Sequence, residues 1–170
     1  MPHLTTRRVE TRRDLHDFLQ LPWSIYGEDP HWVPPLLAEV RTRLDPKQNP
    51  YFQHASAALF LAESDGLVVG RISAQICQLA QQHHEAGEGH FGFFESNDSA
   101  ETAEALFDAA AQWLAEGGMN RMVGPFNFSI HDEAGLLVDG YHRPPYVFMT
   151  HNPRYYQRLF EDAGLHQVMD

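Results

Sequence analysis

The sequence is poor in cysteine, lysine and long apolar runs. Its one cysteine, Cys77, cannot close an intrachain disulfide, so we expect a reducing, cytoplasmic setting. Lys47 is the only lysine, and 12 Lys plus Arg stand against 23 Asp plus Glu, a formal net charge of −11. Nucleic acids and anionic membranes are bound through basic surfaces, so we expect neither as a partner. No apolar run approaches the roughly 20 residues of a membrane span, and residues 1–13 lack the apolar segment of a signal peptide.

The composition is that of a folded protein. Of the 170 residues, 43% are hydrophobic and 12% aromatic, which provides for a sizeable core and argues against disorder. We therefore expect a single domain over residues 1–170. Cys77 lies in the apolar alternation "RISAQIC", which favours a small core residue over a nucleophile.

The first fifty residues predict one strand followed by two helices. The strand covers residues 4–10, "LTTRRVE". Thr11 then caps a helix with Asp14 three residues later, and Pro22 is expected to end it. Pro35 can start the second helix after an extended segment that contains several prolines.

The middle of the chain predicts a hairpin of two strands, then a third strand that continues the antiparallel succession, and then a helix. Residues 57–63 and 67–77 flank the turn "SDG", and a polar loop leads from this hairpin to the strand at 90–95. Asp98 then caps a helix, with Glu101 completing a capping box. Apolar residues at helical spacing predict the buried face of this helix: Ala103, Leu106, Phe107, Ala110 and Leu114.

The last third predicts a strand at 119–126, a long irregular segment, a helix from near Pro153 and one more strand from Leu165. Three strands in antiparallel succession, followed by strand–helix units, indicate an α/β (α+β) fold. We expect a mixed, mainly antiparallel sheet flanked by helices, incomplete at its C-terminal end.

This order of elements, together with "NPRYYQRLFEDAGL", resembles the GNAT superfamily of acyl-CoA-dependent N-acyltransferases. The stretches "YGEDPHWVPPL", "NPYFQHASAALFLAESDGLVVGRISA", "GFFES" and "GPFNFS" are similar to the N-terminal half of longer bacterial GNAT-like proteins. The resemblance implies that an acyl group passes from acetyl-CoA, another acyl-CoA or a pantetheine thioester to a small-molecule amine. It also implies that the strand backbone at Phe93 and Phe94, with Asn127 in the crevice beyond the next strand, holds the cofactor.

Two stretches depart from the pattern of this superfamily. GNAT proteins usually bind pyrophosphate with an R/Q-x-x-G-x-G/A loop, where glycines admit the phosphates to free helix N–H groups. Here "ESNDSAE" contains no glycine and no arginine, and its carboxylates would oppose a pyrophosphate. A tyrosine that protonates the departing thiolate often lies four residues before the glycine that ends the last helix, and here Phe160 has that place. Tyr155 or Tyr156, about one turn earlier, could act from a shifted position.

Acyl transfer to an amine also needs a base. Glu95, at the end of a strand, has a place similar to that of many GNAT bases, although a solvated carboxylate is the plainer interpretation. His131, Asp132 and Glu133 cluster in a loop that is either functional or simply polar. The histidines of "HHEAGEGH" lack the i, i+4 spacing of helical zinc sites, so we predict no metal site.

Aromatic side chains in the segments that contain prolines allow two interpretations. Tyr26, Trp32, Tyr51 and Phe52 either line an acyl or acceptor pocket or fix irregular segments onto the core.

Two functions therefore remain open at the level of sequence. One is a GNAT-like N-acyltransferase with an altered pyrophosphate loop, and the other is a catalytically inactive GNAT-like module for binding or assembly. An incomplete sheet leaves an open edge, so we expect a homodimer or a C-terminal continuation to cover it.

Overall fold

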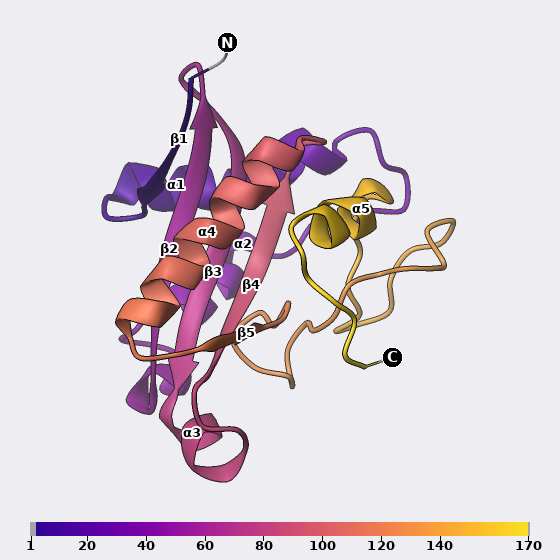
Figure 1. Ribbon diagram of the computed structural model, residues 1–170. Helices are drawn as coiled ribbons and strands as arrows, with labels where there is room; N and C mark the ends of the chain where they lie inside the picture. Colours follow the sequence, from indigo (N-terminus) through magenta and orange to yellow (C-terminus); the bar gives the residue numbers. More distant parts are fainter. Residues whose placement is uncertain (1–2, 170) are drawn as a thin grey trace.

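Five strands form one sheet in the computed structural model, which describes residues 3–169 (Figure 1). Their order, β1-β2-β3-β4-β5, is the order of the sequence. The pairings β1/β2, β2/β3 and β3/β4 are antiparallel, and β4/β5 is parallel. The strands are β1 (Leu4–Arg8), β2 (Ala55–Ser64), β3 (Leu67–Cys77), β4 (Glu88–Ser96) and β5 (Arg121–Val123). The predicted mixed, mainly antiparallel sheet is confirmed.

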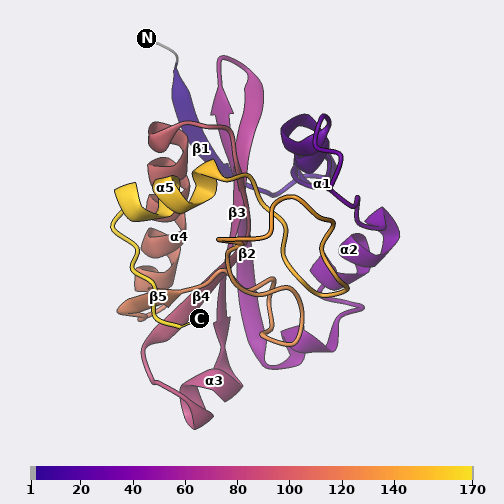
Figure 2. The same cartoon turned by 90° about the vertical axis from the view of Figure 1, so that its right-hand side faces the viewer.

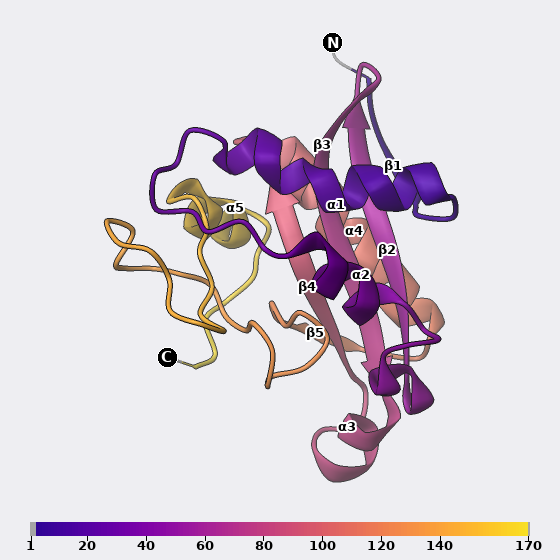
Figure 3. The ribbon, with the colours of Figure 1, turned by 180° about the vertical axis from the view of Figure 1, so that it is seen from behind.

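Helices cover both faces of this sheet (Figure 2). On one face lie α4 (Ala100–Glu116) and α5 (Tyr155–Asp162). On the other lie α1 (Arg12–Tyr26) and α2 (Leu37–Leu44), which Figure 3 shows in front of the strands. Each face has its own apolar core, one centred on Phe91, Phe94 and α4, the other on Phe18, Leu61 and Phe93. The predicted polar loop after β3 contains a short helix, α3 (Gln78–His83), and a 3-10 turn (Pro50–Gln53) precedes β2.

The start of α1 is as predicted, but its end is not. Thr11 accepts from the Asp14 N–H, and the Asp14 carboxylate accepts from the Thr11 N–H, which completes a capping box. Pro22 does not end the helix, which continues to Tyr26. A proline inside a helix leaves the carbonyl four residues earlier without its donor. Here the buried guanidinium of Arg71 donates to that carbonyl, Phe18 O, at 2.6 Å, so the helix continues past the proline.

The predicted buried face of α4 is confirmed in full, but the predicted cap is wrong. Ser99, not Asp98, is the N-cap, and its hydroxyl accepts from the Thr102 N–H at 3.3 Å. Asp98 lies one residue too early to reach these amides and instead pairs with Arg158 of α5.

Ser99→Ala is therefore expected to lower the free energy of unfolding by about 0.5–2 kcal/mol, because it removes the cap. Asp98→Ala removes an ion pair whose side chains are 55% and 52% exposed, so its effect should stay below about 1 kcal/mol. Urea titration of the two variants against the unchanged protein compares them. A larger loss for Asp98→Ala than for Ser99→Ala would contradict this assignment of the cap.

The C-terminal third contains less regular structure than predicted. β5 has three residues where the sequence predicts eight, and the predicted last strand is wrong, since residues 165–169 pair with no strand. Gly164, at φ 78°, ends α5: its N–H donates to Glu161 O and the Leu165 N–H donates to Phe160 O. Residues 165–169 leave this turn as an irregular segment that pairs with no strand, and the outer edge of β5 has no partner within residues 3–169 (Figure 1).

Candidate active site

A β-bulge in β4 decides which way Glu95 points. Ser73 pairs with Gly92 and Arg71 with Glu95, so two residues of β4 lie opposite one residue of β3. Phe93 is the extra residue, and its φ of 47° is unusual for a non-glycine residue. Side chains alternate along a strand, so one inserted residue moves all that follow to the opposite face. Glu95 consequently faces α1 and not α4.

The carboxylate of Glu95 is held by three side chains from three different elements. Its Oε2 accepts from the hydroxyls of Tyr26 at 2.8 Å and Tyr156 at 2.6 Å. Its Oε1 lies 3.7 Å from Nη2 of Arg71. The Tyr156 hydroxyl in turn accepts from the Ser96 N–H at 2.8 Å, which fixes that hydroxyl to the end of β4. Oε1 therefore remains the oxygen that can accept a proton from a ligand.

The charges in this cluster are mutually dependent. Burial raises the pKa of Glu95, and the charge of Arg71 and the two tyrosine hydrogen bonds oppose that rise. Burial and the nearby Glu95 charge raise the pKa of both Tyr26 and Tyr156, so these hydroxyls stay protonated and remain donors. Burial lowers the pKa of Arg71, against the charge of Glu95, but a guanidinium keeps its proton in proteins. Glu95 is therefore a carboxylate with an increased affinity for protons.

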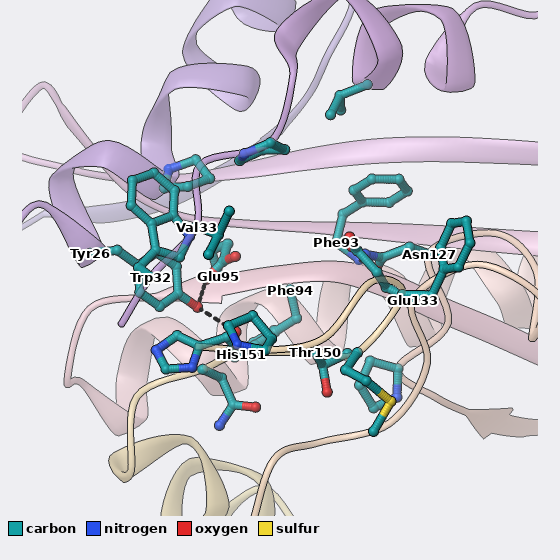
Figure 4. A pocket seen from close by; sticks show the side chains of 18 of the residues that line it. Tyr26, Trp32, Val33, Phe93, Phe94, Glu95, Asn127, Glu133, Thr150 and His151 are labelled. Atoms are coloured by element: carbon teal, nitrogen blue, oxygen red, sulfur yellow. Dashed lines mark hydrogen bonds between the residues drawn. The ribbon is translucent and has the colours of Figure 1, made fainter. Parts of the chain in front are cut away.

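Glu95 borders a cavity of about 510 Å³ that opens between α1, α2, β4 and the irregular segment (Figure 4). One wall is polar and includes Arg71, Glu95, Asn127 and Glu133. The mouth is apolar, and its exposed residues are Val33, Leu36, Tyr146, Val147, Phe148 and Met149. The cavity thus has a titratable carboxylate in its wall and an apolar opening to solvent.

Asn127 fixes the floor of this cavity at the place where β4 and β5 separate. Its Oδ1 accepts from the Phe93 N–H at 2.7 Å, and its Nδ2 donates to Glu133 at 2.7 Å. The chain passes very close to β4 here, since a Cβ on Gly92 would lie 1.8 Å from the Phe126 carbonyl oxygen. The Phe93 N–H is therefore already hydrogen-bonded within the chain.

A second polar pair closes the cavity beside Tyr26. Nε2 of His151 lies 2.7 Å from Asp29 Oδ2, and the His151 side chain is only 4% exposed. Burial opposes the ionisation of Asp29, but the hydrogen bonds from His151 and the His31 N–H hold its pKa below the ordinary value. Trp32 stacks on the Tyr26 ring at 5.2 Å, so these residues fix the tyrosine that holds Glu95.

The structure brings together most of the site residues that the sequence predicts. Glu95, Tyr156, Glu133, Phe93, Phe94 and Asn127 all line the cavity. His131 does not: it is exposed on the loop, where its N–H bonds Ser129 Oγ, so the predicted catalytic role of His131 has no support in this geometry. A neighbour in sequence can point elsewhere in an irregular loop, which is why Glu133 reaches the cavity and His131 does not.

The aromatic residues divide between the two interpretations that the sequence left open. Tyr26 and Trp32 line the cavity, whereas Tyr51 and Phe52 pack against Phe128 in the core beneath α1. Sequence reasoning missed Arg71 and His151. A charged residue inside the apolar run "LVVGRISA" was the available signal for Arg71, because such a residue in a buried strand must have a partner.

The place of the usual pyrophosphate loop holds an ion pair. Asp98 and Asp162 both contact Arg158, and Glu101 lies in the first turn of α4. Neither a glycine loop nor an unpaired cation is present between Glu95 and Glu101.

Among residues 3–169, no three His, Cys, Asp or Glu side chains are grouped so that they could hold a metal ion. No helix in the described part of the chain is long and apolar enough to span a membrane.

The sequence has long relatives. It is 44% identical over 163 residues to a bacterial ceramide synthase of Caulobacter vibrioides and 37% identical over 164 residues to protein YghO of Escherichia coli. These alignments cover 95% and 96% of the chain but 42% of each relative, so the chain spans less than half the length of the curated relatives it matches. No family model matches the sequence.

Solved structures show the fold. The aminoglycoside N-acetyltransferase AAC(6')-Iy, in complex with a bisubstrate analogue of CoA, superposes with a TM-score of 0.57 at 15% identity, covering 99% of this chain and 94% of that one. The aminoglycoside acetyltransferase meta-AAC0020, in complex with sisomicin, has a TM-score of 0.50 at 13% identity and covers 71% and 75%. The chain has the GNAT fold that the sequence predicted.

Proposed function

We propose that this chain carries the catalytic cavity of an N-acyltransferase, in which Glu95 is the general base. The observation that supports this proposal is the placement of Glu95. The bulge in β4 directs this buried carboxylate, whose pKa is raised, toward the cavity. Its Oε2 accepts both tyrosine hydrogen bonds, and its Oε1 has no hydrogen bond from any residue at positions 3–169. A general base acts best when its pKa lies near the working pH, and burial moves this carboxyl in that direction.

The proposed step transfers an acyl group from sulfur to nitrogen. The neutral amine attacks the thioester carbonyl, the C–N bond forms, and the C–S bond breaks. Oε1 of Glu95 takes the proton that the nitrogen loses, and this proton leaves with the thiolate as a thiol. Tyr26 and Tyr156 keep their protons and hold Oε2, which leaves Oε1 directed at the amine.

The acyl donor in this proposal is a pantetheine thioester, with acyl-CoA as one form of it. The residues at the start of α4 do not fit a pyrophosphate in the usual way, because Asp98 and Asp162 already occupy Arg158 and no glycine admits the phosphates to the helix amides. The adenine nucleotide would therefore add little to binding, and the pantetheine arm would make most of the contacts, along β4 near Phe93 and Phe94.

We expect acetyl-CoA to bind this chain with a Kd of about 1 mM or weaker. Asp98→Asn should tighten binding, because it removes a carboxylate and frees Arg158 for the diphosphate. Calorimetry with acetyl-CoA and with S-acetylpantetheine measures both effects, and only acetyl-CoA should respond to Asp98→Asn. The control is Asp45→Asn, a half-buried carboxylate at the end of α2 and away from α4. A low-micromolar Kd for acetyl-CoA on the unchanged chain would refute this prediction.

The acceptor that we propose is an amphiphilic amine. Three carboxylates (Glu39, Glu95 and Glu133) and two guanidiniums (Arg43 and Arg71) line the cavity, which favours a cation by one charge. The apolar mouth favours an alkyl chain. The relative named bacterial ceramide synthase supports this substrate class, since a ceramide is an N-acylated long-chain amine.

The second candidate is a catalytically inactive GNAT-like module that serves binding or assembly. The absence of a glycine loop and the place of Phe160, which packs against Phe94 and Phe107, favour it.

We also infer that the outer edge of β5 is covered by a second copy or by further polypeptide. β5 has three residues and pairs only with β4 within the described part of the chain.

A further inference from the structure

The carbonyl of Phe18 in α1 accepts a hydrogen bond from a side chain outside the helix. Pro22 lies four residues after Phe18 and has no N–H, so the helix cannot satisfy this carbonyl. Phe18 is 0% exposed, which excludes bulk water as a donor. Nη1 of Arg71 donates to it at 2.6 Å from the neighbouring strand β3.

The same guanidinium reaches the base. Its Nη2 lies 3.7 Å from Oε1 of Glu95, and its carbon lies 4.8 Å from the centre of the Phe18 ring. The side chain of Arg71 is 9% exposed, so both contacts occur where water screens charge poorly. The guanidinium is planar and rigid, so the bond to Phe18 fixes the direction in which Nη2 points.

We propose that Arg71 is a positioning residue for Glu95, and that Pro22 supplies its anchor by freeing the carbonyl of Phe18. This inference rests on the proposed function for the role of Glu95 as a base. The contacts of Arg71 and their effect on the titration of Glu95 are properties of the ligand-free protein. Arg71 keeps Glu95 ionised in a buried place and holds Oε1 toward the cavity. The other groups that face Glu95 are the hydroxyls of Tyr26 and Tyr156, and the charge of Glu133 opposes that of Glu95.

Removal of Arg71 is expected to raise the pKa of Glu95. Burial favours the protonated form of Glu95, and a positive charge within about 4–6 Å lowers a carboxyl pKa by about 1–3 pH units. Without Arg71, Glu95 would hold its proton to higher pH and would act as a base only above that pH. A residue that served packing alone would not change this titration.

The test is the titration of the Glu95 carboxyl by NMR, in protein labelled with ¹³C at the glutamate side chains and free of ligand. Glu95→Gln identifies the signal. Arg71→Met should raise the titration midpoint by about 1–3 pH units. Arg71→Lys keeps the charge but cannot reach two partners at fixed angles, so a smaller rise is expected. Pro22→Ala gives Phe18 O a helix donor that competes with Arg71, and it should move the midpoint in the same direction, by less.

The matched control is Arg121→Met, which removes an arginine that pairs with Glu85 and Glu88 at the far end of the sheet. It should leave the Glu95 midpoint unchanged. An unchanged midpoint in Arg71→Met overturns the inference, and an unchanged midpoint in Pro22→Ala alone overturns the part assigned to Pro22. If Arg71→Met does not fold, Arg71→Lys takes its place: a raised Glu95 midpoint supports the inference, and an unchanged midpoint overturns it. Since no substrate is used, a chain that shows these shifts but transfers no acyl group would refute the proposed function and leave this inference standing.

Discussion

Glu95→Gln is expected to reduce acyl transfer by about 10²–10⁴-fold, the usual contribution of a general base. Glutamine has nearly the shape of glutamate and keeps an oxygen for the hydroxyls of Tyr26 and Tyr156, but it cannot take a proton from the amine. The variant should remain folded, because glutamine keeps an acceptor for the two tyrosines and burial already opposes a charge at this position. The measurement is amide formation from an acyl thioester and a long-chain amine.

The pH dependence gives the same prediction an independent check. Glu95 must be ionised to act, so transfer should fall as the pH falls through its raised pKa. Its effect on stability has the opposite sense: a carboxyl whose pKa is higher in the folded state binds more protons there, so its contribution is present at low pH and is lost as the pH rises through the folded value. Glu95→Gln should abolish both dependences.

The control for this variant is Glu88→Gln, at the other end of β4, where the carboxylate contacts His90 and Arg121. It should transfer the acyl group at the unchanged rate. Full activity in Glu95→Gln would mean that another group is the base, and would leave the inactive module as the better account of this cavity.

Gly92→Ala is expected to lower the free energy of unfolding by at least about 3 kcal/mol, beyond the usual cost of overpacking. The new Cβ would lie 1.8 Å from the carbonyl oxygen of Phe126 and 2.5 Å from its carbon, and both are backbone atoms. A side chain could rotate away, but here the chain itself must move. That movement would carry Asn127 away from Phe93 and Glu133, so acyl transfer should fall as well.

Denaturant unfolding of Gly92→Ala and Gly70→Ala makes the comparison. Gly70 lies on the adjacent strand β3, and the nearest atom to its Cβ would be the end of the Leu106 side chain at 2.7 Å, followed by that of Thr102 at 3.0 Å. These groups can shift, so Gly70→Ala should cost clearly less. Equal losses in the two variants would show that the backbone contact at Phe126 relaxes easily.

Features that depend on a few adjacent residues were determined by the sequence alone. Thr11 and Asp14 are three residues apart and form the cap that this spacing predicts. The turn "SDG" joins β2 and β3, and the apolar spacing from Ala103 to Leu114 selects the buried face of α4. These outcomes are local because the partners are fixed by the geometry of one turn or one helix. The order of these elements, together with the stretch "NPRYYQRLFEDAGL", carried the resemblance to the GNAT superfamily.

Errors of the sequence analysis arose where a distant residue competes with a local rule. Pro22 should end a helix, but Arg71 of β3 supplies the missing donor. Asp98 resembles a cap, but Arg158 of α5 takes its carboxylate, and Ser99 caps instead. The predicted strand after Leu165 would need a distant strand to pair with, and residues 165–169 pair with none.

The candidate site depended most on the tertiary structure. The sequence indicates Glu95 as a carboxylate at a strand end, but strand alternation alone would place it on the same face as Phe91, toward α4. The bulge at Phe93 reverses that face, and the bulge exists because β3 and β4 pair around it and Asn127 holds the Phe93 N–H. Pairing between strands and a hydrogen bond across 34 residues are long-range interactions, and no local pattern in the sequence encodes them.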